Sequence, residues 1–91
     1  MAGITAVIVK IFPDSLDTDL NKIKQEAQKL LEKEGAKNIS FEEILIAFGL
    51  KAIKIKFAWP EEKNTDIIDN LLASIPHVSS AKIEDYRRAF G

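Results

Sequence analysis

Few side chains in this sequence have the type and spacing that covalent catalysis requires. His77 is the only histidine and the chain has no cysteine, so a histidine–cysteine metal site has too few ligands. Glu42 and Glu43 are adjacent in an expected strand, so their carboxylates face opposite sides and cannot act together on one substrate. The glycines are isolated and form no phosphate-binding loop. We therefore expect a protein that is not an enzyme, with no catalytic residues, no metal site and no cofactor.

A Phe-Gly corner is the most informative feature of the chain. An apolar run ends in Phe48 and Gly49, and an alternating strand follows directly. Tight turns of this kind normally carry polar pairs such as Asn-Gly. A large ring at a turn costs roughly 1.5–3 kcal/mol if it could otherwise be buried. Phe48 therefore either folds back over its own sheet edge or contacts a partner.

The C-terminal end carries a second candidate contact. Arg87 and Arg88 lie in the last expected strand, where adjacent side chains face opposite sides, so one of them can join a given surface. The planar guanidinium fork matches phosphate and carboxylate groups well. The alternative is a polar terminus without a specific contact.

Length and charge restrict the classes of function. The 91 residues predict one domain over 1–91 with a modest core, and the net charge of −1 does not favour a general nucleic-acid binder. The apolar run near the N-terminus is too short to span a membrane and resembles no signal peptide. We expect a cytoplasmic protein that binds neither nucleic acid nor a membrane directly.

Two segments have apolar residues at helical spacing, and four have the composition of strands. The first helix is expected over 18–34 and stops at Gly35, and the second ends at Pro76. The candidate N-caps are Asp17 or Thr18 for the first and Asn64 or Thr65 for the second. The strands are expected over 4–12, 37–47, 50–59 and 78–88.

This order, strand-helix-strand-strand-helix-strand, predicts a ferredoxin-like α+β sandwich. Right-handed crossovers give a four-stranded antiparallel sheet with both helices on one face. The strand over 50–59 agrees, because its apolar residues alternate with lysines. The expected core side chains of that strand are Ile53, Ile55, Phe57 and Trp59.

RNA-recognition domains share this topology but stack bases on aromatic side chains of the open face. Here Phe57 and Trp59 have the same parity as the core residues, so that platform is missing. Lys51, Lys54 and Lys56 could line the open face, where a solvated surface is the simpler interpretation. Trp59 is expected to cap the core.

Nearly the whole chain resembles the archaeal translation elongation factor 1-beta family, short relatives of the eukaryotic guanine-nucleotide-exchange domain. The resemblance is carried by Pro13 after the first strand, by the corner Ile46-Ala47-Phe48-Gly49-Leu50-Lys51-Ala52, and by the ending Val78-x4-Ile83-x3-Arg87-Arg88. It implies the same fold and the release of GDP from elongation factor 1-alpha, the GTPase that delivers aminoacyl-tRNA.

The resemblance also implies site residues. Phe48, with Gly49 and Lys51 beside it, matches the corner that reaches into the GTPase. Arg88 stands where the eukaryotic relatives place a lysine near the phosphate and magnesium site, and Arg87 takes that place if the alignment shifts by one. We expect a monomer, with Phe48 and Arg88 near the same end of the sheet.

Two other functions are compatible with this fold. A small self-associating ligand-binding or regulatory module would bury Lys54 and Lys56 at a dimer seam, which is costly unless acids pair with them. An acylphosphatase-like enzyme needs a phosphate-binding arginine loop after the first strand, where this chain has Pro13-Asp14-Ser15-Leu16-Asp17.

Overall fold

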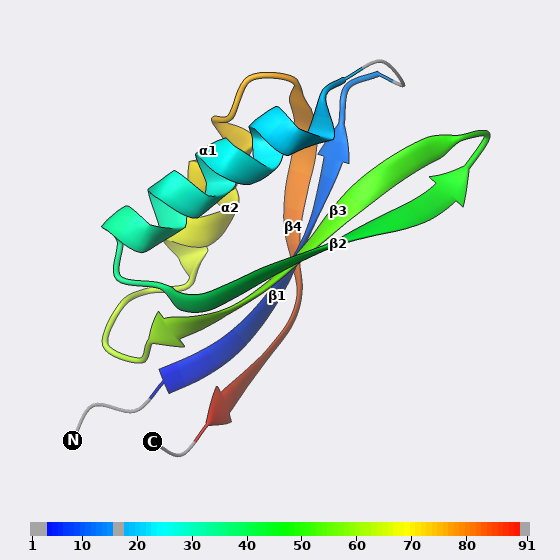
Figure 1. Ribbon diagram of the computed structural model, residues 1–91. Coiled ribbons are helices and arrows are strands. Elements are labelled where there is room, and N and C mark those ends of the chain that lie inside the picture. Colours follow the sequence, from blue (N-terminus) through cyan, green and yellow to red (C-terminus); the bar gives the residue numbers. More distant parts are fainter. Residues whose placement is uncertain (1–3, 16–17, 90–91) are drawn as a thin grey trace.

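The computed structural model describes residues 4–15 and 18–89. These residues form the predicted order of elements. Along the chain they are β1 (Ile4–Pro13), α1 (Leu20–Lys33), β2 (Lys37–Ala47), β3 (Leu50–Pro60), α2 (Asp66–Ala73) and β4 (Val78–Ala89). The strands form one antiparallel sheet in the order β2-β3-β1-β4, and both helices lie over the same face (Figure 1). The ferredoxin-like prediction is confirmed.

The core lies between this sheet face and the two helices. β1 is a central strand, and every second side chain from Val7 to Ile11 is fully buried. β3 contributes Ile53, Ile55, Phe57 and Trp59, as its alternation predicts, and Trp59 is 0% exposed. The helices complete the core with Ile23, Ala27, Leu31, Ile68 and Leu72. Trp59 is therefore a core residue, as expected.

The ends of the helices differ in detail from the sequence-based expectation. The N-cap of α1 is Asp19, whose carboxylate accepts a hydrogen bond from the backbone N–H of Asn21 at 3.0 Å. Thr18 instead donates its hydroxyl hydrogen bond to Asp14, and Asp17 lies outside the described residues. A cap at position 18 was thus wrong by one residue, because three adjacent polar residues compete for the same role.

Gly35 ends α1 as predicted. Its φ of +96° is a left-handed conformation that glycine adopts without a steric penalty. The N–H of Gly35 bonds to the carbonyl of Glu32, and the N–H of Ala36 to that of Leu31, which is a Schellman motif. At α2, Thr65 occupies the N-cap, while the side chain of Asn64 accepts from the N–H of Asp66 at 2.9 Å.

The β2–β3 hairpin extends beyond the rest of the sheet. β1 pairs with β3 up to Ile11, which lies opposite Ile53, and β3 continues past that point alongside β2. Figure 1 shows the hairpin projecting away from the helices. The C-terminal end of β4 lies at the opposite end of the sheet. The molecule measures 45 × 21 × 19 Å along its principal axes, so its two ends are far apart.

Candidate functional site

The tip of the hairpin is a tight turn with an unusual residue in it. Ala47 pairs with Leu50, so Phe48 and Gly49 are the two central turn residues. Their φ angles are +52° and +81°, and two positive values are the mark of a type I′ turn. Glycine accepts this conformation freely, whereas a residue with a Cβ pays about 1–2 kcal/mol for it. The turn therefore holds Phe48 at a cost to the free energy of folding.

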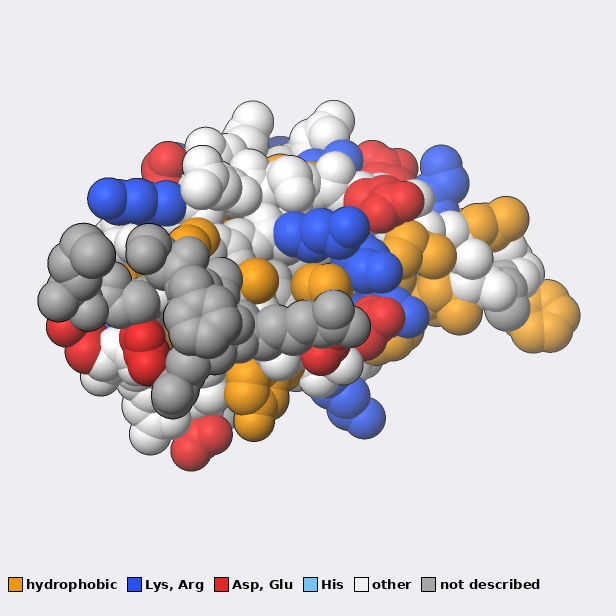
Figure 2. All heavy atoms as spheres, turned by 90° about the horizontal axis from the view of Figure 1, so that it is seen from below, with side chains coloured by type: hydrophobic (Ala, Val, Ile, Leu, Met, Phe, Trp, Pro, Cys, Tyr) orange, Lys and Arg blue, Asp and Glu red, His pale blue; other side chains and the backbone are white. Residues whose placement is uncertain are grey.

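The ring of Phe48 does not fold back over the sheet edge. Its side chain is 98% exposed, the largest value among the exposed hydrophobic residues of the described chain. Hydrophobic side chains lie over the hairpin at the right end of Figure 2, next to the charged groups at its base. An exposed ring in a strained turn contributes nothing to the core, which leaves partner contact as the reading of Phe48 that the geometry supports.

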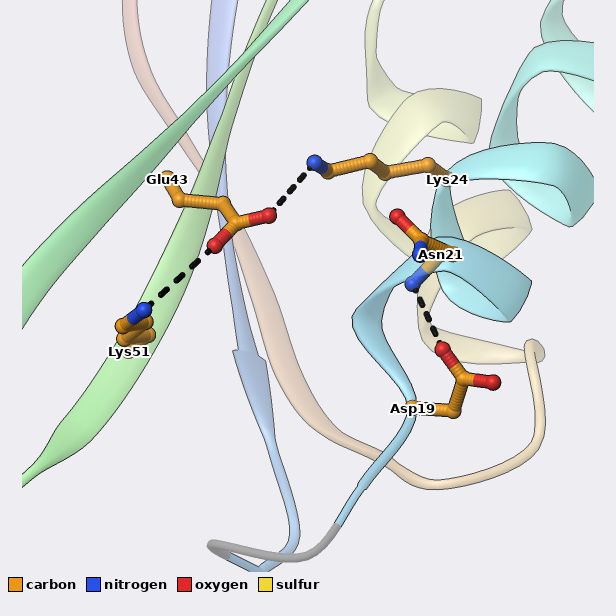
Figure 3. A network of polar contacts seen from close by, with 5 residues as sticks. All are labelled: Asp19, Asn21, Lys24, Glu43 and Lys51. Carbon is orange, nitrogen blue, oxygen red and sulfur yellow. Dashed lines mark hydrogen bonds and ion pairs between the residues drawn. The ribbon is translucent and has the colours of Figure 1, made fainter.

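A charged cluster joins the base of the hairpin to α1. The ammonium of Lys24 donates a hydrogen bond to one carboxylate oxygen of Glu43 at 2.7 Å, and Lys51 lies 3.8 Å from the other (Figure 3). The hydrogen bond and charge of Lys24, with a smaller contribution from Lys51, lower the pKa of Glu43 below its ordinary value. The cluster therefore connects β2 and β3 to α1 through ion pairs at the surface.

This cluster corrects the expected position of Lys51. Its pairing with Glu43, which itself reaches α1, places Lys51 on the helix-covered side of the sheet instead of the open face. A recess of about 270 Å³ lies between the hairpin base and the first turn of α1, with Gly49, Lys51 and Asn21 in its lining. Lys54, by contrast, pairs with Glu84, which also pairs with Lys10.

The two arginines lie at the other end of the sheet. In the register of β4 against β1, Arg87 is opposite Ala6 and Arg88 is opposite Thr5, and Thr5 is in turn opposite Trp59 of β3. Trp59 is nine positions after Leu50, the first residue beyond the turn, which corresponds to roughly 30 Å along an extended strand. The expectation that Phe48 and Arg88 lie near the same end of the sheet was wrong.

The physical reason for this error is the direction of the strands. β3 leaves the Phe48 corner and ends beside the start of β1, and antiparallel β4 ends at that same place. A contact made by Phe48 and a contact made by Arg88 must therefore fall on separate surfaces of a partner. The turn residues Phe48, Gly49 and Lys51 form one group, and Arg87 and Arg88 form another.

The sequence that forms this sheet matches a known protein family along nearly its whole length. A model described as "EF-1 guanine nucleotide exchange domain" matches residues 6–89, from β1 to the end of β4. The chain belongs to this exchange-domain family. Both groups of candidate residues fall inside the matched range.

Curated relatives of this exchange domain carry the name "Elongation factor 1-beta". The protein of Metallosphaera sedula is 40% identical over 79 residues, which cover 85% of this chain and 86% of the relative. That of Methanocella arvoryzae is 37% identical over 91 residues, or 99% of this chain and 100% of the relative. That of Sulfolobus acidocaldarius is 36% identical over 84 residues, or 90% and 92%. The resemblance seen in the sequence is confirmed.

The remaining polar residues of the exchange domain give little indication of a further functional site. His77 is an exposed loop residue whose Nδ1 lies 3.6 Å from a carboxylate oxygen of Asp14. Among the residues that the structure describes, no three His, Cys, Asp or Glu side chains are grouped so that they could hold a metal ion. No helix in the described part is long and apolar enough to cross a membrane.

Sequence reasoning missed two exposed apolar residues of the exchange domain. Leu45 is 67% exposed and Ile46 is 43% exposed, both directly before the Phe48 turn. The signal in the sequence was the loss of alternation from Ile44 onward, which is typical of a strand buried on both faces. In this structure the same run belongs to a hairpin that leaves the core.

Proposed function

We propose that this chain promotes release of GDP from translation elongation factor 1-alpha during protein synthesis. Membership of the exchange-domain family supports the reaction, and the names of the relatives support the translation system as its setting. The observation that carries the assignment of residues is the 98% exposure of Phe48 in a turn that disfavours it. The protein would act in the cytoplasm, where translation takes place, and as a monomer until it meets the GTPase.

The two ends of the sheet would have different tasks. P-loop GTPases hold their nucleotide largely through magnesium and through backbone and lysine groups around the phosphates. A guanidinium from Arg88, or from Arg87, whose side chains lie outside the described part of the structure, could compete with magnesium and lysine for those phosphate groups. Phe48, with Gly49 and Lys51, would bind a second surface of the GTPase roughly 30 Å away, a span set by the register of β3 and β4.

Thermodynamic linkage explains how such binding releases GDP. If the chain binds the nucleotide-free GTPase more tightly than the GDP-bound form, GDP affinity falls by the same factor. No bond in the nucleotide is formed or broken. The sheet acts as a rigid spacer, because its central strand β1 is buried against both helices and pairs with strands on both sides.

The direct test is release of a fluorescent GDP analogue from purified elongation factor 1-alpha. Catalytic amounts of the chain should accelerate release many-fold, and Phe48→Ala and Arg88→Ala should each reduce the acceleration while the far-ultraviolet circular dichroism stays unchanged. Normal exchange by both variants would show that the site residues are wrongly assigned. No acceleration by the unmodified chain at excess concentration would remove the proposed function itself.

Light scattering separates this proposal from the self-associating module. The exchange factor should have the mass of one chain without its partner. A module that pairs through the open sheet face would have to bury Lys10 and Lys54 together with Glu84, which pairs with both of them. A stable dimer of this kind would favour the alternative.

A further inference from the structure

The end of the β2–β3 hairpin carries an exposed apolar side chain on each face as well as at its tip. Leu45 lies opposite Lys51 in the register, so it shares the helix-covered side with the Glu43 cluster. Ile46 is the next residue, at the shift in register before Ala47, and its side chain points to the other side. Leu45, Ile46 and Phe48 are 67%, 43% and 98% exposed.

A hairpin that lies flat on a partner needs apolar side chains on one face only, and the other face stays polar. Here each face presents an exposed apolar side chain, Leu45 on one and Ile46 on the other, and hydrophobic groups are visible at this end of the molecule in Figure 2. The hairpin continues past the last β1–β3 pair, and Leu45 and Ile46 stay 67% and 43% exposed there. The geometry fits insertion into a cleft better than docking on a plane.

We infer that the hairpin end enters a two-walled apolar cleft of the GTPase, with Leu45 against one wall, Ile46 against the other and Phe48 at the bottom. The inference rests on the proposed function and extends it from one ring to three side chains. On the side of Leu45 the cluster of two lysines and one glutamate has a formal charge of +1. The rim of that wall should therefore be acidic.

A second copy of this chain is a less suitable occupant. If two copies paired antiparallel along the full length of their β2 edges, Glu42 and Glu43, at the middle of the strand, would face the same residues of the other copy, and like charges across a strand pair are destabilising. The strained turn at Phe48 offers no strand edge with which a second copy could pair, whereas insertion into a cleft would bury the whole ring. The surface is also continuous with the Phe48 contact that exchange requires.

The absence of cysteine from the chain allows a direct test. Leu45→Cys, Ile46→Cys and, as a matched control, Ile67→Cys each introduce one thiol. Ile67 is on α2 and is 40% exposed, close to the value for Ile46. The rate of reaction with a maleimide is measured by mass spectrometry on this chain, alone and with nucleotide-free elongation factor 1-alpha in excess, after gel filtration has shown whether a complex forms.

In the complex, we expect the thiols at positions 45 and 46 to react at least tenfold more slowly, and the control thiol at its unchanged rate. Protection at one of the two positions would overturn the two-walled cleft and leave a one-sided contact, with the proposed function intact. Equal protection of the thiol at position 67 would also overturn the two-walled cleft. So would protection of the thiols at positions 45 and 46 that appears without the GTPase when the chain is concentrated. If no complex forms, the proposed function fails, and this inference fails with it.

Discussion

Replacing Phe48 by glycine should make the protein more stable and less active at once. The φ of +52° costs a residue with a Cβ about 1–2 kcal/mol, and glycine removes this cost while losing about 0.5–1 kcal/mol through its more flexible unfolded chain. The 98% exposed ring contributes no burial energy to the folded state. The net expected gain in the free energy of unfolding is about 0–1.5 kcal/mol, and the middle of that range, about 0.75 kcal/mol, raises the melting temperature of a domain of this size by about 3–6 °C.

The same substitution should weaken the contact with the GTPase. Full burial of a phenylalanine ring is worth about 1.5–3 kcal/mol, and each 1.4 kcal/mol is a factor of ten in affinity. In the GDP-release assay, the concentration for half-maximal acceleration should therefore rise about 10–150-fold. Phe48→Ala is the matched control, since it removes the ring but keeps the strain: it should lose as much activity with little change in melting temperature. Unchanged exchange by Phe48→Gly would refute the role of the ring, and a lower melting temperature would refute the strain.

Two further predictions concern stability. The fold favours the ionised form of Glu43 because Lys24 lowers its pKa, so this carboxylate stabilises the protein above its ordinary value of 4.5 and the contribution is lost as the pH falls below that value. The difference in the free energy of urea unfolding between the unmodified chain and Glu43→Gln should shrink from pH 7 to pH 3, and a difference independent of pH would contradict the pairing. Trp59→Ala, which empties a fully buried site, should lower the free energy of unfolding by about 3–5 kcal/mol. Trp59→Phe should cost less, because the indole N–H has no hydrogen-bond partner among the described residues; equal losses for the two variants would contradict this account.

Most of the fold could be predicted from local patterns. The alternation of Ile53, Ile55, Phe57 and Trp59 identified the buried face of β3, and Gly35 identified the end of α1. Both signals are local, since they depend on strand periodicity and on the conformational freedom of glycine. The N-cap of α1 was missed by one or two positions because the adjacent polar residues there are chemically equivalent for this role.

The site could be predicted only in part. Residue type was enough to identify Phe48 as a candidate, because tight turns favour Gly, Pro, Asn, Asp and Ser, and a large aromatic ring does not stabilise such a turn. The large distance of Phe48 from Arg88 follows from the predicted topology and was overlooked: β3 and β4 are both antiparallel to β1 and so run in the same direction, which puts the start of β3 and the end of β4 at opposite ends of the sheet. The side of the sheet on which Lys51 lies was predictable from strand periodicity and was missed, since Lys51 has the same parity as Ile53, whereas its pairing with Glu43 depends on the register of β2 against β3.

The central claim is that the two ends of the sheet have separate tasks on one GTPase. The measurement that tests it most directly is a full titration of Phe48→Ala and Arg88→Ala in the GDP-release assay, with the maximal rate and the half-maximal concentration determined for each. The account predicts that Phe48→Ala raises the half-maximal concentration and keeps the maximal rate, whereas Arg88→Ala lowers the maximal rate with little change in the half-maximal concentration. If both variants change the same parameter to the same extent, the division of tasks between the two ends is contradicted.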